Sequence, residues 1–157
     1  MLIRSLALAT SLALAANAAF AQDFPVTLEH AWGSTTIEAA PQRIVTWGWG
    51  NEDAVIALGV IPVGIPFQSY GGGEDGVQPW IEEALAATGA QTPAILDNAG
   101  EPPFEQIAAL EPDLILAVYS GVTEEQYALL SAIASTRRRP YRPRLARWRT
   151  GARIALR

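Results

Sequence analysis

The sequence predicts an α/β domain in which helices flank a mainly parallel β-sheet, and three observations support this fold class. Short β-rich runs alternate with helical stretches between residues 44 and 134, and such alternation is typical of a parallel sheet. The order helix, glycine, proline-initiated strand occurs twice, at Gly59 and at Gly89, with the spacing of one βαβ unit. Residues 114–119 are apolar without polar alternation, which indicates a parallel strand that is covered on both faces.

The individual elements follow from β-rich runs, helix start signals and chain breakers. The predicted strands are residues 26–30, 34–38, 44–47, 60–67, 93–96 and 114–119, and the predicted helices are residues 51–58, 80–88, 104–110 and 123–134. Trp32 and Gly33 lie between the first two strands, which predicts an N-terminal β-hairpin. The glycine-rich residues 68–78 predict a loop, and right-handed crossovers place the helices on the faces of the sheet.

The predicted helices carry start and stop signals. Asn51 precedes two carboxylates, and its side chain can accept a hydrogen bond from the free backbone N–H groups of a first helical turn. Thr123 precedes two glutamates in the same way, and Pro102-Pro103 suits the start of a helix. Gly59 tolerates the left-handed conformation in which helices commonly end.

The formal net charge of −5 is the sum of two regions with opposite sign. All 16 acidic residues lie between Asp23 and Glu125, whereas nine of the 11 basic residues are arginines within residues 137–157. A single folded surface normally carries interspersed signs. The sequence therefore predicts an acidic domain over residues 22–134 and an Arg/Pro-rich, disordered tail over residues 135–157.

The composition excludes several classes of site. The chain has no cysteine, which rules out disulfides, thiolate metal sites and cysteine nucleophiles. The one histidine, His30, lies in the hairpin region far in sequence from the strand ends, so neither a multi-histidine metal centre nor a catalytic triad is expected. The Gly71-Gly72-Gly73 run lacks the phosphate-loop pattern and precedes two carboxylates. We expect no enzymatic activity, no metal site and no cofactor.

The first 21 residues have the three parts of a secretory signal peptide. Arg4 is followed by the apolar residues 6–16 and by a small-x-small site that ends at Ala21. The apolar run is shorter than the roughly 20 residues that a bilayer-spanning helix needs. We therefore expect cleavage after Ala21 and export to the periplasm.

Ligands of parallel α/β sheets bind beyond the carboxyl ends of the strands. The residues expected there are aromatic or polar, and none is lysine or arginine: Trp47, Trp49, Asn51, Gln68, Ser69, Tyr70, Asp97, Asn98, Tyr119 and Ser120. Two interpretations of Trp47 and Trp49 stay open, packing and ligand contact, because Gly48 and Gly50 leave space around the rings.

Three blocks of the sequence resemble the periplasmic solute-binding proteins of ABC transporters for iron-siderophores, haem and cobalamin. They are residues 41–45 (Pro-Gln-Arg-Ile-Val), residues 52–64 (from Glu-Asp-Ala-Val to Pro-Val-Gly) and residues 104–116 (from Phe-Glu-Gln-Ile to Leu-Ile-Leu). The resemblance covers residues 22–134 and implies a single Rossmann-like lobe. Complete members of the family have two α/β lobes joined by a long helix, with the ligand clamped between them. We expect this sequence to contain the N-terminal lobe and to lack the second one.

The resemblance implies the substrate-binding component of an ABC importer for a ferric siderophore, with the chelate as transported ligand and an inner-membrane permease as partner. Glu105 matches the carboxylate that docks on permease arginines, whereas by itself it would be a solvated first-turn carboxylate. The ligand-binding candidates are Trp47, Trp49, Asn51, Tyr70, Asn98 and Tyr119. Ferric hydroxamate binders of the family carry an arginine near residues 97–100, where this sequence has Asp-Asn-Ala-Gly, so the type of chelate stays open.

Two hypotheses account for residues 135–157. In the first, the composition there is that of GC-rich DNA read out of frame, so the chain is a truncated binding protein with a meaningless tail. In the second, the chain is a secreted one-domain protein whose arginines, interleaved with Tyr141 and Trp148, bind a polyanion. The acidic domain would repel polyanions, which favours the first hypothesis, and no nucleic-acid partner is expected.

Overall fold

A computed structural model of the protein describes residues 23–30 and 32–137. The strands in it are β1 Val26–His30, β2 Gly33–Ile37, β3 Ile44–Thr46, β4 Gly64–Pro66, β5 Ala94–Leu96, β6 Leu114–Leu116 and β7 Ser135–Arg137. The helices are α1 Asn51–Ala57, α2 Pro79–Thr88, α3 Phe104–Ala109 and α4 Glu124–Ile133. The signal peptide and most of the tail predicted from the sequence lie outside the described residues.

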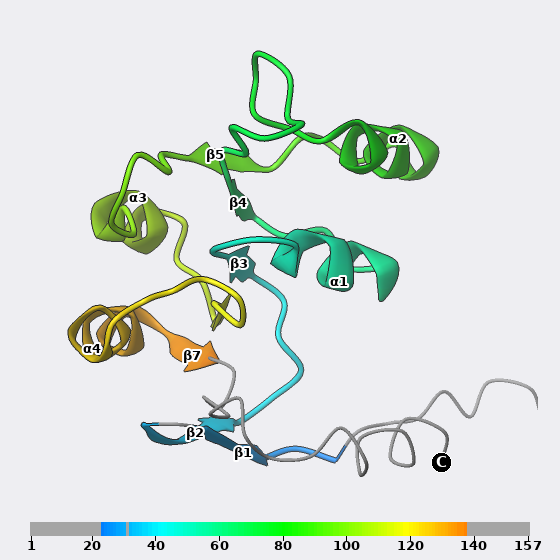
Figure 1. Ribbon diagram of the computed structural model, residues 1–157. Helices are drawn as coiled ribbons and strands as arrows, with labels where there is room; N and C mark the ends of the chain where they lie inside the picture. The colour runs from blue at the N-terminus through cyan, green and yellow to red at the C-terminus, as the bar shows by residue number, and fades with distance from the viewer. Residues whose placement is uncertain (1–22, 31, 138–157) are drawn as a thin grey trace, which may run out of the picture.

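A five-stranded sheet in the order β5-β4-β3-β6-β7 forms the centre of the described region, and each of its strand pairs is parallel. Helices α1 and α2 lie on one side of this sheet and α3 and α4 on the other, as Figure 1 shows. Strands β1 and β2 pair separately as an antiparallel hairpin. The predicted fold class, a mainly parallel sheet flanked by helices with an N-terminal β-hairpin, is confirmed.

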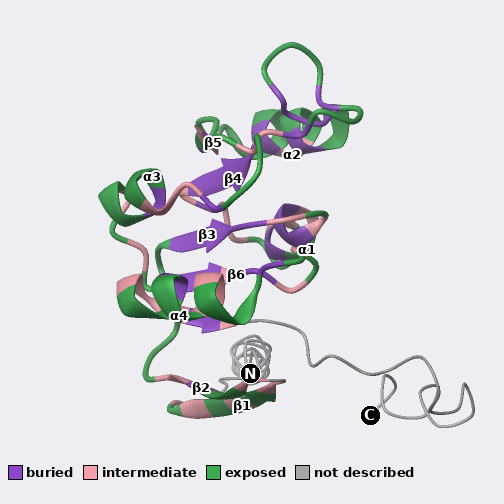
Figure 2. Ribbon diagram, turned by 60° about the vertical axis from the view of Figure 1, so that its left-hand side comes forward, coloured by how far each residue is buried: buried purple, intermediate pink, exposed green. Residues whose placement is uncertain are grey.

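The core divides between the two faces of the sheet because successive strand residues point to opposite sides. Val45 and Ile115 are fully buried with Ile107 and Leu130, the buried residues of α3 and α4. Ile44, Val55 and Leu114 form a second cluster with α1, and a third cluster lies under α2. Figure 2 shows β3, β4 and β6 as the buried layer between more exposed helices.

The hairpin docks beside β7, far from it in sequence. Thr35 Oγ1 donates a hydrogen bond to the Thr136 carbonyl at 2.7 Å, and Ser135 Oγ donates to the Thr36 carbonyl at 3.2 Å. His30 Nε2 lies 2.9 Å from the hydroxyl of Tyr127 on α4. His30 is therefore a residue of the hairpin–helix contact.

The tail boundary predicted after residue 134 needs a correction. Residues 135–137 form β7, which pairs in parallel with β6 from Leu114↔Ser135 to Leu116↔Arg137. The local composition resembled a tail, but Thr136 is buried because β6 and the hairpin enclose it. Ordered structure in the described residues therefore continues to Arg137.

The helix ends agree with the sequence in part. Thr123 caps α4 with a capping box that includes Gln126, as its position predicts. Gly59 follows α1 with a φ of 81° and confirms the predicted stop. The predicted cap at Asn51 is wrong: Gly50 is the N-cap of α1, and the Asn51 Nδ2 donates to the Trp47 carbonyl at 2.7 Å.

At the edge of the sheet where β3 and β6 begin, an arginine and an aspartate hold the two chain segments together. Asp113 accepts hydrogen bonds from the backbone N–H groups of Gln42 and Arg43, at 2.6 and 3.0 Å. The Arg43 side chain donates to the carbonyls of Leu110 and Glu111. These bonds join two of the sequence blocks and set the register between the starts of β3 and β6.

Candidate functional site

The strand order reverses beside β3, and this reversal defines the place where a ligand would bind. The chain runs from β3 outward to β4 and β5, then returns to the other side of β3 to form β6 and β7. The loops that follow β3 and β6 consequently diverge towards helices on opposite faces of the sheet (Figure 1). Open α/β sheets bind ligands in the crevice at such a switch point.

The loops at this switch point are bonded to each other. The backbone N–H of Trp49, after β3, donates to the carbonyl of Tyr119, after β6, at 2.9 Å. Gly48 makes this approach possible: a Cβ atom there would lie 2.5 Å from Ser120 Cα and would also meet the Tyr119 carbonyl oxygen. The φ of Gly48 is 98°, a backbone conformation that also favours glycine.

Three aromatic side chains are exposed at this edge, and we call Trp49, Tyr70 and Tyr119 the aromatic rim. Trp49 is 42% exposed, Tyr70 is 79% exposed and Tyr119 is 69% exposed. The rings of Trp49 and Tyr70 are in tilted contact, with centroids 5.9 Å apart. Tyr70 belongs to the loop between β4 and α2, which projects from the lobe at the top of Figure 1. Large exposed aromatic surface of this kind is typical of sites that bind another molecule.

The other three ligand-binding candidates lie deeper. Trp47 is 3% exposed and packs in the main core cluster, so the packing interpretation of this residue applies in this structure. Asn51 is buried and holds the loop after β3 through the Trp47 carbonyl. Asn98 is half-buried and donates to the Phe67 carbonyl at 2.9 Å, which joins the loops after β4 and β5. These residues support the rim from below.

A buried carboxyl group lies beneath the rim, where the sequence alone indicates only a helix-start charge. Glu52 is 1% exposed, and its Oε1 accepts a hydrogen bond from Gln68 Nε2 at 2.8 Å. Burial raises the pKa of the Glu52 carboxyl above its usual value of 4.5, and the neighbouring Asp53 acts in the same direction. The sequence gives no signal for this contact, because Glu52 lies in α1 and Gln68 lies 16 residues later, in the loop after β4.

Trp80 is a further exposed aromatic residue, and it is not among the ligand-binding candidates predicted from the sequence. It lies in the first turn of α2, is 51% exposed, and donates from Nε1 to Asp53 Oδ1 at 2.8 Å. Asp53 thus has a partner and is more than a helix-start charge. The bond ties the first turns of α1 and α2 together beside the rim.

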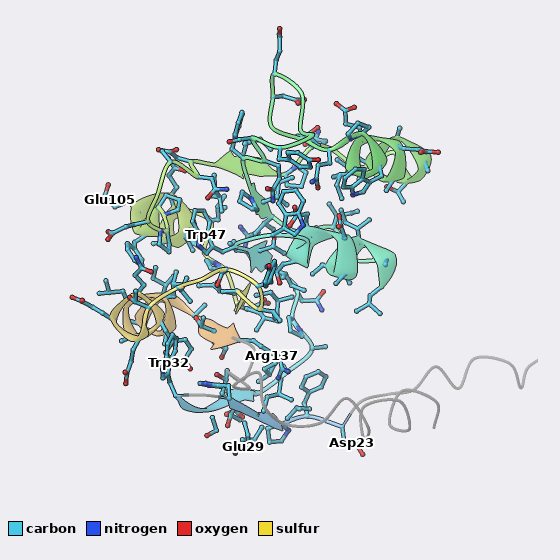
Figure 3. The ribbon with its side chains drawn as sticks, in the orientation of Figure 1. Asp23, Glu29, Trp32, Trp47, Glu105 and Arg137 are labelled. Atoms are coloured by element: carbon cyan, nitrogen blue, oxygen red, sulfur yellow. The ribbon has the colours of Figure 1, made fainter. Side chains whose placement is uncertain are left out.

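Two further residues complete this edge. Glu105 is exposed in the first turn of α3, and Figure 3 shows it pointing away from the lobe. Arg137 ends β7 at the same edge, since Leu116 pairs with it in parallel register. The expected absence of arginine from the strand ends is therefore wrong, because the sequence assigns residue 137 to the tail.

The described residues contain no group of three or more His, Asp or Glu side chains placed to hold a metal ion. Among the same residues, no helix is long and apolar enough to cross a bilayer. What the edge does offer is aromatic surface with amide and backbone hydrogen-bonding groups, which suits binding of a molecule without covalent change to it.

The sequence profile of the periplasmic binding protein family matches residues 44–153, which is most of the chain. The chain belongs to this family. The match extends past residue 134, the last residue that the three sequence blocks and their resemblance cover. Members of the family are substrate-binding proteins and not enzymes.

Two curated relatives and one solved structure are similar to this chain. The Fe(3+) dicitrate-binding periplasmic protein FecB of Escherichia coli is 34% identical over 94 residues, which are 60% of this chain and 29% of FecB. The probable siderophore-binding lipoprotein YfiY of Bacillus subtilis is 36% identical over 118 residues, 70% of this chain and 31% of YfiY. Streptococcus pneumoniae PiaA in complex with ferrichrome is 38% identical with a TM-score of 0.70, over 78% of this chain and 40% of PiaA.

The chain thus spans between 29% and 40% of the length of these three family members. The described residues form one α/β lobe, in agreement with this share.

Proposed function

We propose that this lobe binds a ferric siderophore or a related ferric chelate, as part of the substrate-binding component of an ABC importer in the periplasm. The observation that carries the proposal is the aromatic rim, exposed at the switch point of a lobe whose relatives bind ferric citrate and ferrichrome. The iron would arrive inside its chelate as cargo, so the lobe needs no metal ligands of its own. The signal peptide that the sequence predicts supports the assignment to the periplasm.

The rim would bind the chelate through its aromatic faces. Trp49 and Tyr70 already contact each other and together offer a rigid apolar surface that loses little entropy on binding. Tyr119 lies across the switch point and is tied to Trp49 through the backbone. We assign contact with the chelate to these three residues, and support of the loops to Trp47, Asn51 and Asn98.

Titration of the purified chain with ferrichrome and with ferric citrate tests this proposal. One lobe supplies only part of the clamp, so we expect saturable but weak binding, with Kd on the order of 0.1–1 mM, or about −4 to −5.5 kcal/mol. Quenching of tryptophan fluorescence and calorimetry measure it. The iron-free forms of the same chelators serve as controls, and equal signals from the iron-loaded and iron-free forms would contradict the proposal.

Trp49→Ala should weaken binding of the chelate that binds the wild-type chain by about 5- to 30-fold, since truncation of an aromatic contact residue costs about 1–2 kcal/mol. The matched control is Trp80→Phe, which removes the bond to Asp53 but keeps an aromatic ring outside the rim. Calorimetry compares the three proteins. Equal affinities of wild type and Trp49→Ala would remove the rim from the proposed site.

No observation on the described residues favours the polyanion-binding alternative. Apart from Arg137, the arginines on which this alternative depends lie outside the described residues. The names of the two curated relatives describe binding of Fe(3+) dicitrate and of a siderophore, not of a polyanion.

A further inference from the structure

The carboxyl group of Glu52 is buried with one oxygen unpaired. Its side chain is 1% exposed and belongs to the first turn of α1. Oε1 accepts the hydrogen bond from Gln68, whereas Oε2 is buried and has no hydrogen-bond partner among the described residues. A buried carboxylate without donors for both oxygens is costly, far more so than the same group in its neutral form.

The bond between Glu52 and Gln68 lies where the loops that carry the Trp49 and Tyr70 rings meet. Gln68 Nε2 donates both to Glu52 Oε1, at 2.8 Å, and to the Gly48 carbonyl, at 3.2 Å. Gly48 directly precedes Trp49, and Gln68 lies two residues before Tyr70. The contact between the Trp49 and Tyr70 rings is thus built on a three-way junction of Glu52, Gln68 and Gly48.

No cationic side chain faces Glu52 among the described residues. On α1 the neighbouring ionisable group is Asp53, itself acidic, together with backbone groups of the first turn. The loop after β4 contributes the uncharged Gln68. Arg43 is bonded to carbonyls at the opposite edge of the sheet, and Arg137 ends β7, two strands away from β3. Desolvation, which raises the pKa of Glu52, is opposed only by hydrogen bonds from Gln68 and the backbone.

We infer that Glu52 is a positioning residue of the aromatic rim, which in its protonated form holds the Trp49 and Tyr70 loops together and on ionisation loosens them, so that chelate capture is linked to one proton. The inference rests on the proposed function for its ligand. Its physical reason is that an ionised Glu52 must draw water to its unpaired oxygen, which opens the junction beneath the rings. Proton uptake and chelate binding then favour the same conformation.

Ferrichrome is a suitable probe because the complex carries no net charge. Its electrostatic attraction to the acidic lobe therefore does not change with pH. We expect its affinity for the wild-type chain to fall as the pH rises through the pKa of Glu52, by at most about tenfold per pH unit for one linked proton. Glu52→Gln, which cannot ionise, should show a flat profile. Glu82→Gln, in the exposed first turn of α2, is the matched control and should keep the wild-type profile.

A ligand-free measurement separates this inference from the proposed function. The near-ultraviolet circular dichroism of the Trp49–Tyr70 pair should change with pH in the wild type, and the change should be absent from Glu52→Gln. Gln68→Met removes the bridge itself and should show the high-pH signal of the wild type at every pH. If neither ferrichrome nor ferric citrate binds, the proposed function fails, while the dichroism still decides the role of Glu52. Identical pH profiles of wild type and Glu52→Gln would overturn the inference.

Discussion

Replacing Gly48 with alanine is expected to lower the free energy of unfolding by roughly 2–5 kcal/mol. The positive φ of 98° contributes strain on the order of 1–2 kcal/mol for a residue with a Cβ atom. The new methyl group would also lie 2.5 Å from Ser120 Cα, and overpacking of this kind costs about 1–3 kcal/mol. Backbone atoms are the obstacle, so no change of rotamer can relieve the clash.

Urea denaturation of the whole chain, followed by far-ultraviolet circular dichroism, measures this loss. Gly59→Ala is the matched control, because Gly59 has a φ of 81° and a Cβ atom there would meet nothing within 4 Å. The control should lose only the strain contribution, about 1–2 kcal/mol. Equal losses for the two variants would show that the close approach of the loops after β3 and β6 does not exist in solution.

Glu105→Arg should abolish uptake of the ferric chelate when this lobe is part of a complete two-lobed protein working with its permease. Glu105 is exposed in the first turn of α3, a helix that begins at the edge carrying the rim. The substitution would place a positive side chain against the arginines of the permease on which the carboxylate docks. Two like charges placed against each other at an interface cost several kcal/mol. The proposed role follows from the family resemblance, and the exposure of Glu105 supports it.

Uptake of radioactive iron by cells is the measurement, together with the affinity for the chelate and the thermal unfolding of the isolated protein. Glu82→Arg makes the same charge reversal in the exposed first turn of α2 and should leave uptake unchanged. The expected pattern is a loss of uptake for Glu105→Arg alone, with unchanged affinity and unfolding. Full uptake by Glu105→Arg would refute the docking role.

The order of elements was predictable from the sequence because local signals specify it. The apolar residues 114–119 indicated a buried parallel strand, and β6 is one. Thr123 signalled the start of α4, where it forms a capping box. Each of these signals lies within a few residues of the feature that it predicts, so no distant contact is needed to interpret it.

Features that depend on distant contacts were missed or misplaced. Residues 135–137 look like tail in composition, yet they complete the sheet because β6 supplies their hydrogen bonds. Asparagine is a residue type that commonly caps helices, but the side-chain amide of Asn51 donates a hydrogen bond to the Trp47 carbonyl instead. In both cases a contact made by the fold outweighs a local preference.

The sequence by itself determined the α/β lobe, its elements in order as far as α4, the family, and the aromatic and amide character of the edge where the strands end. Only the tertiary structure decided which of those residues are exposed, leaving Trp49 on the rim and Trp47 in the core. It also brought Glu52 against Gln68 beneath the rim. The reason is that hydrophobic periodicity and capping are encoded within one turn or strand, whereas burial depends on which segments the sheet order brings together.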